Sequence, residues 1–281
     1  MFYIPERTIQ ELLEEDLHLL DMTTQALGIE KKPGRIDCFP KRSCVVAGVE
    51  EAERVFACAG AHADILAPSG SRLEAGDVCL RVTGTAGALH AACKVAQNVM
   101  EYSSGIATRC AAMVDAARSV SPHVEVAVTR KHFPGGKRLS LKAALAGGAS
   151  IHRTGLSDSI LVFDQHRVFA GGAQGFARMI GGISARYPEK KIAAEANDPD
   201  EAALFARAGA DVIQCERFTY DDLRRTVRDI RAIRPSVKVS AAGGVNADNA
   251  VEFAATGVDI LVTSWVYFGK PEDIKMRFVP A

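Results

Sequence analysis

A basic run that directly follows a short β-branched stretch is the first feature of the sequence that could do chemistry. Arg130 and Lys131 come after the apolar residues 126–128 and before Pro134-Gly135-Gly136. Proline and adjacent glycines stop both strands and helices, so we expect a loop that begins at the end of a strand. A guanidinium group binds carboxylate or phosphate oxygens through two parallel hydrogen bonds. The loop therefore predicts contact with a small anion, and a solvated basic loop is the alternative.

Other polar or small residues follow further apolar runs that we predict to be strands. The runs are 124–128, 149–152, 160–163, 191–196, 212–215, 237–241 and 260–263. They alternate with amphipathic stretches, which is typical of βα units, and this number of strands favours a closed barrel over an open sheet. The residues at their ends are Arg130, Lys131, His152, Arg153, Asp164, His166, Glu195, Glu216, Ala242, Gly243, Gly244 and Ser264. In a barrel these ends lie on one rim, where catalytic residues are found.

Each of these residues also has a structural interpretation. His152 or His166 is more often a hydrogen-bonded structural histidine than a catalyst. Glu195 lies among alanines on a predicted buried strand, so its carboxylate needs a partner or a metal ion. Gly243 and Gly244 could hold a phosphate with backbone N–H groups, although two adjacent glycines are a weak signal. Their joint placement suits transfer of a sugar phosphate. That reaction needs N–H groups that bind the phosphate, cations for a pyrophosphate leaving group and carboxylates that stabilise developing positive charge.

The N-terminal part of the chain predicts a smaller α+β domain. A helical pattern covers residues 5–20, and several short strands of an antiparallel sheet lie within 35–82 around a helix at 50–60. A long helical pattern over 86–118 is interrupted at the small residues 103–105. Small residues let two backbones approach closely, so we interpret this interruption as a joint between domains.

Composition limits the class of protein and of partner. A chain of 281 residues with 48% hydrophobic residues can bury a large core. Lys plus Arg and Asp plus Glu are balanced at 34 each, which argues against nucleic acid or an anionic membrane as the main partner. Seven cysteines without a C-x-x-C pair are typical of reduced thiols. Without a signal peptide or an apolar run of about 18 residues, we expect a cytoplasmic protein that does not span a membrane.

Four motifs, in the same order along the chain, resemble the quinolinate phosphoribosyltransferase family, also called nicotinate-nucleotide pyrophosphorylase (carboxylating). They are Glu15-Asp16-x-x-x-x-Asp21-x-Thr23-Thr24, Ser104-Gly105-Ile106-Ala107-Thr108, Thr129-Arg130-Lys131-x-x-Pro134-Gly135 and Gly147-Gly148-x-x-x-His152-Arg153-x-Gly155-Leu156-x-Asp158. The resemblance implies a type II phosphoribosyltransferase fold. An N-terminal α+β sandwich domain would cover 1–107, joined by 266–281, and an incomplete parallel α/β barrel would cover 108–265. It also implies a homodimer, or a higher oligomer, whose active site is shared between subunits.

The resemblance further implies a role for individual residues. The residues that would bind the acceptor are Arg130, His152, Arg153 and Phe163. The catalytic residues would be Lys131, Glu195 and Glu216, and the two glutamates would also bind Mg²⁺. Gly243 and Gly244 would bind the 5-phosphate of phosphoribosyl diphosphate, and the remaining substrate-binding positions would be Ala242 and Ser264. Lys94 would be contributed across the dimer.

Several of these positions depart from the family pattern. Phe163 stands in place of a substrate-contacting lysine, and Lys94 in place of an arginine. Glu216-Arg217 replaces Asp-Asn, Ala242 replaces serine and Ser264 replaces glycine. Losing one cation and gaining an aromatic face weakens binding of a dicarboxylate, and lysine lacks the bidentate fork of arginine. The sequence around Phe163 looks like the ModD branch of the family, whose members are named pyrophosphorylases and are associated with molybdate transport and molybdenum utilisation.

We therefore expect a phosphoribosyltransferase that uses phosphoribosyl diphosphate and Mg²⁺ on a carboxylated aromatic acceptor, quinolinate or a relative. The alternative is a non-catalytic protein that binds an oxyanion such as molybdate, or a nucleotide, at the same basic rim. An unrelated phosphate-binding barrel, such as an isomerase, is a weaker alternative because it would lack the N-terminal motifs.

Overall fold

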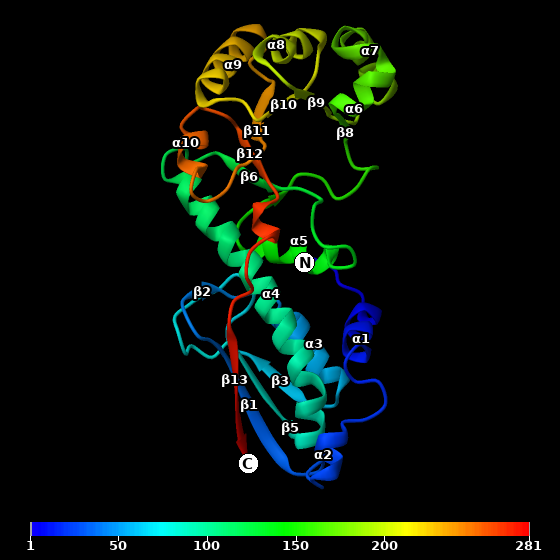
Figure 1. The fold of residues 1–281 in the computed structure, drawn as a ribbon, viewed down its shortest axis with the longest axis vertical. Helices are drawn as coiled ribbons and strands as arrows, with labels where there is room; N and C mark the ends of the chain where they lie inside the picture. The colour runs from blue at the N-terminus through cyan, green and yellow to red at the C-terminus, as the bar shows by residue number, and fades with distance from the viewer. Residues whose placement is uncertain (1, 281) are drawn as a thin grey trace. The chain divides into compact units, whose positions relative to one another are not determined.

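The computed structural model describes residues 2–280, which form two compact units (Figure 1). Of these residues, unit 1 comprises 2–111, 133–148 and 267–280, and unit 2 comprises 112–132 and 149–266. The long helix α4 (Ala86–Arg118) contributes residues to both units. Residues 133–148 group with unit 1, whereas the predicted barrel domain included them. The predicted domain bounds stay a prediction, because a compact unit need not be a separately folding domain.

Unit 1 contains an antiparallel sheet with the strand order β13-β1-β5-β3. Its strands are β1 (Pro33–Pro40), β3 (His62–Ile65), β5 (Leu80–Thr85) and β13 (Ile274–Pro280), and β2 (Cys44–Val45) pairs separately with β4 (Arg72–Leu73). Alternation along β1 places Ile36 and Cys38 in the core, where both are fully buried. The expected antiparallel sheet is therefore present. No strand was predicted at β13, although the C-terminal segment was expected to join this part of the chain.

Three helices of unit 1 bury apolar residues in one core together with this sheet: α1 (Glu6–Glu14), α3 (Val49–Cys58) and α4. Unit 1 also contains α2 (Met22–Ala26), in which the buried residue is Thr24, and α5 (Lys137–Ala146), whose Leu139 packs against this core. The single helix predicted over 5–20 is wrong, because α1 already ends at Glu14. α2 begins after Asp21, whose carboxylate accepts hydrogen bonds from the N–H groups of Thr23 and Thr24 at 3.0 and 3.2 Å. This cap starts a new helix instead of ending the first.

The interruption predicted in the long helix is also wrong, because α4 runs continuously through residues 103–105. The small residues instead allow other segments of unit 1 to approach the helix. The Ala47 N–H donates to Ser104 Oγ at 3.0 Å, and a Cβ added to Gly105 would lie 2.9 Å from the Lys270 carbonyl oxygen. Close backbone approach was therefore predicted correctly, but the break in the helix was not.

Unit 2 contains a parallel sheet with the strand order β7-β6-β12-β11-β10-β9-β8. Its strands are β6 (Glu125–Val128), β7 (Ser150–Ile151), β8 (Ile160–Val162), β9 (Ile192–Ala196), β10 (Val212–Glu216), β11 (Lys238–Ala242) and β12 (Ile260–Thr263). All seven predicted strands are confirmed. β7 and β8 form the two edges, and among residues 2–280 they do not pair with each other, so the sheet stays open. The closed barrel favoured by the strand count is therefore wrong, and the incomplete barrel is confirmed.

Short helices connect the strands of unit 2 and lie along the outside of its sheet (Figure 1). They are α6 (Asp164–Arg167), the 3₁₀ turn η1 (Val168–Ala170), α7 (Gly172–Arg186), α8 (Pro199–Ala208), α9 (Tyr220–Ile233) and α10 (Ala250–Ala254), and the 3₁₀ turn η2 (Trp265–Tyr267) follows β12. Side chains cap two of these helices: Asp198 accepts from the Glu201 N–H at 2.8 Å at the start of α8, and Thr219 accepts from the Asp222 N–H at 3.1 Å at the start of α9. α10 begins after Asn249.

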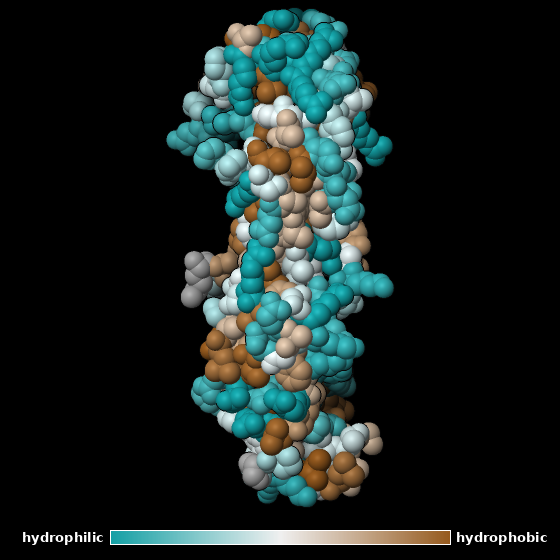
Figure 2. Space-filling model, turned by 90° about the vertical axis from the view of Figure 1, so that its left-hand side faces the viewer, coloured by the Kyte–Doolittle hydropathy of each residue, from teal (hydrophilic) through white to brown (hydrophobic). Residues whose placement is uncertain are grey.

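Polar side chains cover most of the face shown in Figure 2, and apolar side chains gather there in separate patches. One such patch lies near the lower end of this view. Apart from this view, Met22 on α2 and Leu27, which directly follows α2, are exposed by 77% and 66%. Within residues 2–280, no helix combines the length and the apolar character needed to cross a membrane.

A partly buried ion cluster joins α5 to α3 within unit 1. Lys142 Nζ lies 2.8 Å from Glu50 Oε2 and 2.7 Å from Glu51 Oε1. Ser69 donates to the same Glu50 carboxylate through its N–H and its hydroxyl group. Burial alone would raise the pKa of Glu50, but the hydrogen bonds from Lys142 and Ser69 lower it to about 2. The ionised form of Glu50 therefore stabilises the folded state.

We predict that Glu50→Gln lowers the free energy of unfolding by roughly 2 kcal/mol at about pH 7, since the side chain is one-third exposed and solvent screens part of the interaction. The folded-state pKa lies below the unfolded value, so this contribution is present above the unfolded pKa and is lost as the pH falls from about 5 towards 2. Urea denaturation of both proteins across this range measures it, with Glu53→Gln on the same helix as the control. A difference between wild type and Glu50→Gln that does not change with pH would contradict the interpretation.

Candidate active site

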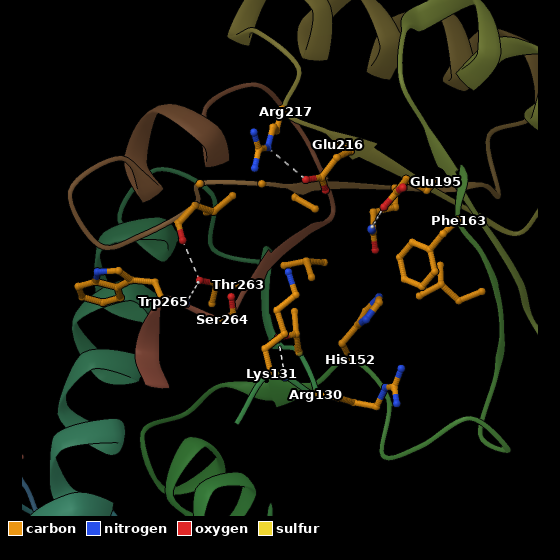
Figure 3. A pocket seen from close by; sticks show the side chains of 18 of the residues that line it. Arg130, Lys131, His152, Phe163, Glu195, Glu216, Arg217, Thr263, Ser264 and Trp265 are labelled. Carbon is orange, nitrogen blue, oxygen red and sulfur yellow. Dashed lines mark hydrogen bonds and ion pairs between the residues drawn. The ribbon is translucent and has the colours of Figure 1, made fainter. Parts of the chain in front are cut away.

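The carboxyl ends of the parallel strands in unit 2 surround a cavity of about 770 Å³ (Figure 3). Its lining residues are Thr129, Arg130, Lys131, His152, Arg153, Leu161, Phe163, Gln165, Glu195, Gln214, Glu216, Arg217, Ala242, Gly243, Gly244, Val245, Asn246, Val262, Thr263, Ser264 and Trp265. Of the residues predicted at the strand ends or assigned a role by the resemblance, Asp164, His166 and Lys94 are not in this set, and all the others are. Lys94 lies on α4 in unit 1, is exposed, and donates from Nζ to Gln97 Oε1 at 2.7 Å.

One part of the pocket is basic. Arg130 and Lys131 are exposed after β6, and Arg153, which follows β7, is only 7% exposed. Within residues 2–280, none of the three has a carboxylate within ion-pair distance. Burial, followed by repulsion from Arg130, lowers the pKa of Arg153. Burial, followed by repulsion from Arg153, likewise lowers the pKa of His152, which is therefore neutral at about pH 7. A bound anion would relieve this repulsion.

Phe163 borders the basic part at the end of β8 (Figure 3). The Arg153 guanidinium carbon lies 5.7 Å from the centre of the Phe163 ring. On the same turn, the Phe163 N–H donates to His166 Nδ1 at 3.0 Å, and the two rings stack with their centres 5.8 Å apart. His166 does not line the pocket, so the structural interpretation of this histidine fits best. An aromatic surface therefore adjoins the anion-binding residues.

The opposite part of the pocket is acidic. Glu195 on β9 is 9% exposed, and the neighbouring Gln214 on β10 donates from Nε2 to Glu195 Oε2 at 3.1 Å. Burial, followed by the charge of Glu216, raises the pKa of Glu195. The N–H of Asp164 at the start of α6 also donates to this carboxylate and acts in the opposite direction. The two glutamates thus repel each other in a place that a cation would stabilise.

Two carboxylates of this kind fit Mg²⁺. That ion usually keeps water ligands and binds through one or two carboxylates together with substrate phosphates. The described part of the chain holds no group of three or more His, Cys, Asp or Glu residues that could bind a metal by themselves. Glu195 and Glu216 would therefore hold Mg²⁺ jointly with a phosphate-containing substrate.

A turn of two glycines closes the pocket after β11. Gly243 and Gly244 have φ values of 89° and 79°, in the region that glycine adopts without strain. A Cβ on Gly243 would lie 2.5 Å from Arg217 Cγ and 2.7 Å from Glu216 Oε1, so only glycine fits there. Across residues 2–280, the N–H groups of both glycines donate to no other residue. They are available to a phosphate oxygen.

Some lining residues were not predicted. Gln214 and Thr263 lie on strands, and Thr263 Oγ1 donates to the Val245 carbonyl at 2.7 Å, which fixes the segment after the glycine turn. Side chains two residues apart on a strand point to the same side of the sheet, so Gln214 lies on the same side as Glu216. This alternation is the sequence signal that could have revealed Gln214. Arg217 was noted only as a departure from the family pattern. Trp265 comes from the turn after Ser264, and the sequence gives no signal that it reaches the pocket.

Models of one family match nearly all of the chain. The N-terminal domain of quinolinate phosphoribosyl transferase matches residues 21–104, and its C-terminal domain matches residues 106–277. The chain belongs to the quinolinate phosphoribosyltransferase family. It is therefore a pentosyltransferase that resembles nicotinate-nucleotide pyrophosphorylase (carboxylating), and it has the type II phosphoribosyltransferase fold.

Curated relatives include both branches of the family. Two of them are ModD proteins, which are named as pyrophosphorylases. The ModD protein of Pasteurella multocida is 35% identical over 98% of this chain and 98% of its own length. The ModD protein of Rhodobacter capsulatus is 41% identical over 92% of this chain and 98% of its own length. The nicotinate-nucleotide pyrophosphorylase (carboxylating) of Rattus norvegicus is 31% identical over 92% of this chain and 87% of its own. The crystal structure of NadC from Streptococcus pyogenes superposes with a TM-score of 0.89 and 25% identity, covering 98% of this chain and 96% of that one.

Arg167 stabilises the start of α6, which contacts Glu195 in the acidic part of the pocket. This arginine on α6 is 1% exposed, and its guanidinium pairs with Asp164 at 3.0 Å and with Glu201 on α8 at 2.8 Å. It also lies over the Phe205 ring at 5.2 Å. These contacts fix the start of α6, where the Asp164 N–H reaches Glu195.

We predict that Arg167→Met lowers the free energy of unfolding by about 2–4 kcal/mol, because the substitution leaves Glu201 partly buried without its cation. Denaturant unfolding measures the change. Arg178→Met, on the exposed face of α7, is the matched control and should cost less than about 0.5 kcal/mol. Equal effects of the two substitutions would show that the Arg167 ion pairs contribute nothing specific.

Proposed function

We propose that this protein transfers the phosphoribosyl group of phosphoribosyl diphosphate to the ring nitrogen of a carboxylated aromatic acceptor, quinolinate or a relative. The observation that supports it most is the presence, in one pocket, of cations without carboxylate partners, a buried acid beside a partly buried one, and a glycine turn. Each of the three matches one part of this reaction: an anionic acceptor, a sugar that gains positive charge, and a phosphate.

The acceptor would lie at the basic end of the pocket. Arg130 and Arg153 would bind its carboxylate through paired hydrogen bonds, and His152 would donate one more. The Phe163 ring would pack against the aromatic ring of the acceptor. These contacts would point the acceptor nitrogen at C1 of the ribose, and the arrangement would act through orientation.

Transfer would form a bond from the acceptor nitrogen to ribose C1 and break the bond from C1 to the diphosphate oxygen, whose electron pair leaves with pyrophosphate. Glu195 and Glu216 would stabilise positive charge on the ribose and hydrogen-bond its hydroxyl groups. Lys131 would bind the diphosphate, and Gly243, Gly244 and Ser264 the 5-phosphate. Bound Mg²⁺ would supply further positive charge to the leaving group.

The assembly and context of the enzyme are also part of this proposal. Lys94 is exposed and does not line the pocket of its own chain. In a homodimer with shared sites, Lys94 of the second copy would add a cation to the anionic substrates. We place the enzyme in the cytoplasm, and we link it to molybdenum utilisation through its similarity to the ModD proteins.

We predict that the protein releases pyrophosphate from phosphoribosyl diphosphate in a reaction that requires Mg²⁺ and an aromatic acid. Arg130→Ala should lower kcat/KM by roughly 10–100-fold, the loss expected for one charged hydrogen-bonded contact. Arg178→Ala, an exposed arginine outside the pocket, should leave kcat/KM unchanged. Quinolinate, nicotinate and other aromatic acids are compared as acceptors in a coupled pyrophosphate assay.

No release with any acid, in a protein that still binds molybdate or a nucleotide, would overturn the transferase proposal. The basic pocket would then serve anion binding without catalysis, because its cations have no carboxylate partners within residues 2–280. Activity on another acid without activity on quinolinate would keep the reaction type and change the acceptor.

Phe163 is the second test position. We predict that Phe163→Lys binds quinolinate roughly tenfold more tightly than wild type, because it adds a cation beside Arg153 for a second carboxylate. Phe163→Leu removes the ring without adding charge and should bind no better than wild type. Calorimetric titration with quinolinate and nicotinate measures both. If Phe163→Lys gains nothing, residue 163 does not select between one and two carboxylates.

A further inference from the structure

Arg217 has an unusual backbone conformation directly beside the glycine turn. Its φ of 57° is the only positive value at a non-glycine position among residues 2–280. This left-handed conformation is unfavourable for side chains with a Cβ, and only glycine, asparagine and aspartate adopt it readily. An arginine there is held by its surroundings, and such positions are found preferentially at binding and catalytic sites.

A hydrogen bond and the missing Cβ of Gly243 allow Arg217 to lie beside the turn. Its N–H donates to the Ala242 carbonyl at 2.8 Å, and its Cγ lies 2.5 Å from where a Cβ on Gly243 would be. The side chain therefore leaves the backbone along Gly243 and brings its guanidinium group to the edge of the pocket (Figure 3). The backbone conformation and the absent side chain of Gly243 together determine this position.

The contact with Glu216 does not account for the conformation. Arg217 Nε lies 3.6 Å from Glu216 Oε1, and the Arg217 side chain is 83% exposed. An ion pair this long and this exposed contributes little to stability. Across residues 2–280, the two terminal amino groups of Arg217 have no further partner. They can donate to a ligand.

The charge of Glu216 makes a cation necessary at this turn if the turn binds a phosphate. Glu216 Oε1 lies 2.7 Å from the same Cβ position on Gly243, so a carboxylate lies close to the glycine turn. Without compensation, this carboxylate would repel a phosphate. A guanidinium beside it offsets this charge and offers a planar set of donors that fits phosphate oxygens.

We propose that Arg217 binds the terminal monophosphate of the sugar-phosphate donor, together with the N–H groups of Gly243 and Gly244. This inference rests on the proposed function for the identity of the donor. It assigns to Arg217 a substrate-binding role that depends on the neighbouring Glu216: the arginine offsets the acid that the ribose end of the site requires.

Calorimetric titration with two separate probes tests the proposal, because ribose 5-phosphate carries only the monophosphate and inorganic pyrophosphate only the diphosphate. Arg217→Gly should weaken the binding of ribose 5-phosphate at least tenfold and the binding of pyrophosphate by less than about threefold. Lys131→Ala should weaken the binding of pyrophosphate more than the binding of ribose 5-phosphate. Arg178→Ala should change the affinity for neither probe. Arg217→Lys, which keeps the charge without the planar fork, should give an intermediate loss for ribose 5-phosphate.

Thermal unfolding separates binding from folding. The left-handed conformation suits glycine, so Arg217→Gly should keep the wild-type Tm or raise it slightly while it loses ribose 5-phosphate affinity. Unchanged ribose 5-phosphate affinity, equal losses for both probes, or no binding of ribose 5-phosphate to the wild type would each overturn the proposal. The wild type could also bind ribose 5-phosphate in a way that depends on Arg217 and yet release no pyrophosphate in the transferase assay. That result would overturn the transferase function and support the role of Arg217.

Discussion

Burial and like-charge repulsion act together on the ionisable groups of the pocket. In the basic part they lower the pKa values of His152 and Arg153, and in the acidic part they raise the pKa of Glu195. Both shifts show that the unliganded pocket is electrostatically unfavourable. A substrate with a carboxylate at one end and a developing positive charge at the other would relieve both clusters. The parallel sheet makes this arrangement possible, because its strands all deliver their carboxyl ends to the same edge.

Local patterns were sufficient to predict the strands of unit 2. Each is a short apolar run bounded by glycine, proline or a capping residue, and such signals depend only on neighbouring residues. Closure of the sheet depends on whether β7 and β8 meet, which no local pattern records, and the count of strands gave the wrong answer. The continuity of α4 was missed for a similar reason. Gly105 lowers helix propensity locally, but contacts with residues far along the chain stabilise the helix there.

The positions of the site residues were predictable to the extent that they end strands. Arg130, Glu195 and Glu216 were found because charged residues are conspicuous after or within buried apolar runs, and the pocket contains all three. Gln214 was missed because a neutral amide within a strand gives no such contrast. Lys94 was placed at the site only by the family resemblance, and the pocket of its own chain does not include it. The conformation of Arg217 depends on the adjacent Gly243, which comes from the next strand.

The pairing of β1 with β13 has a consequence for the order of folding. Asp37 on β1 meets Arg277 on β13 across 240 positions of sequence, and the whole of unit 2 lies between them. During synthesis on the ribosome, the edge of β1 therefore remains unpaired until unit 2 has been translated. An unpaired strand edge is a site of aggregation and of chaperone binding. The nascent chain thus exposes its N-terminal sheet for most of its translation, and completion of that sheet is a late event with high contact order.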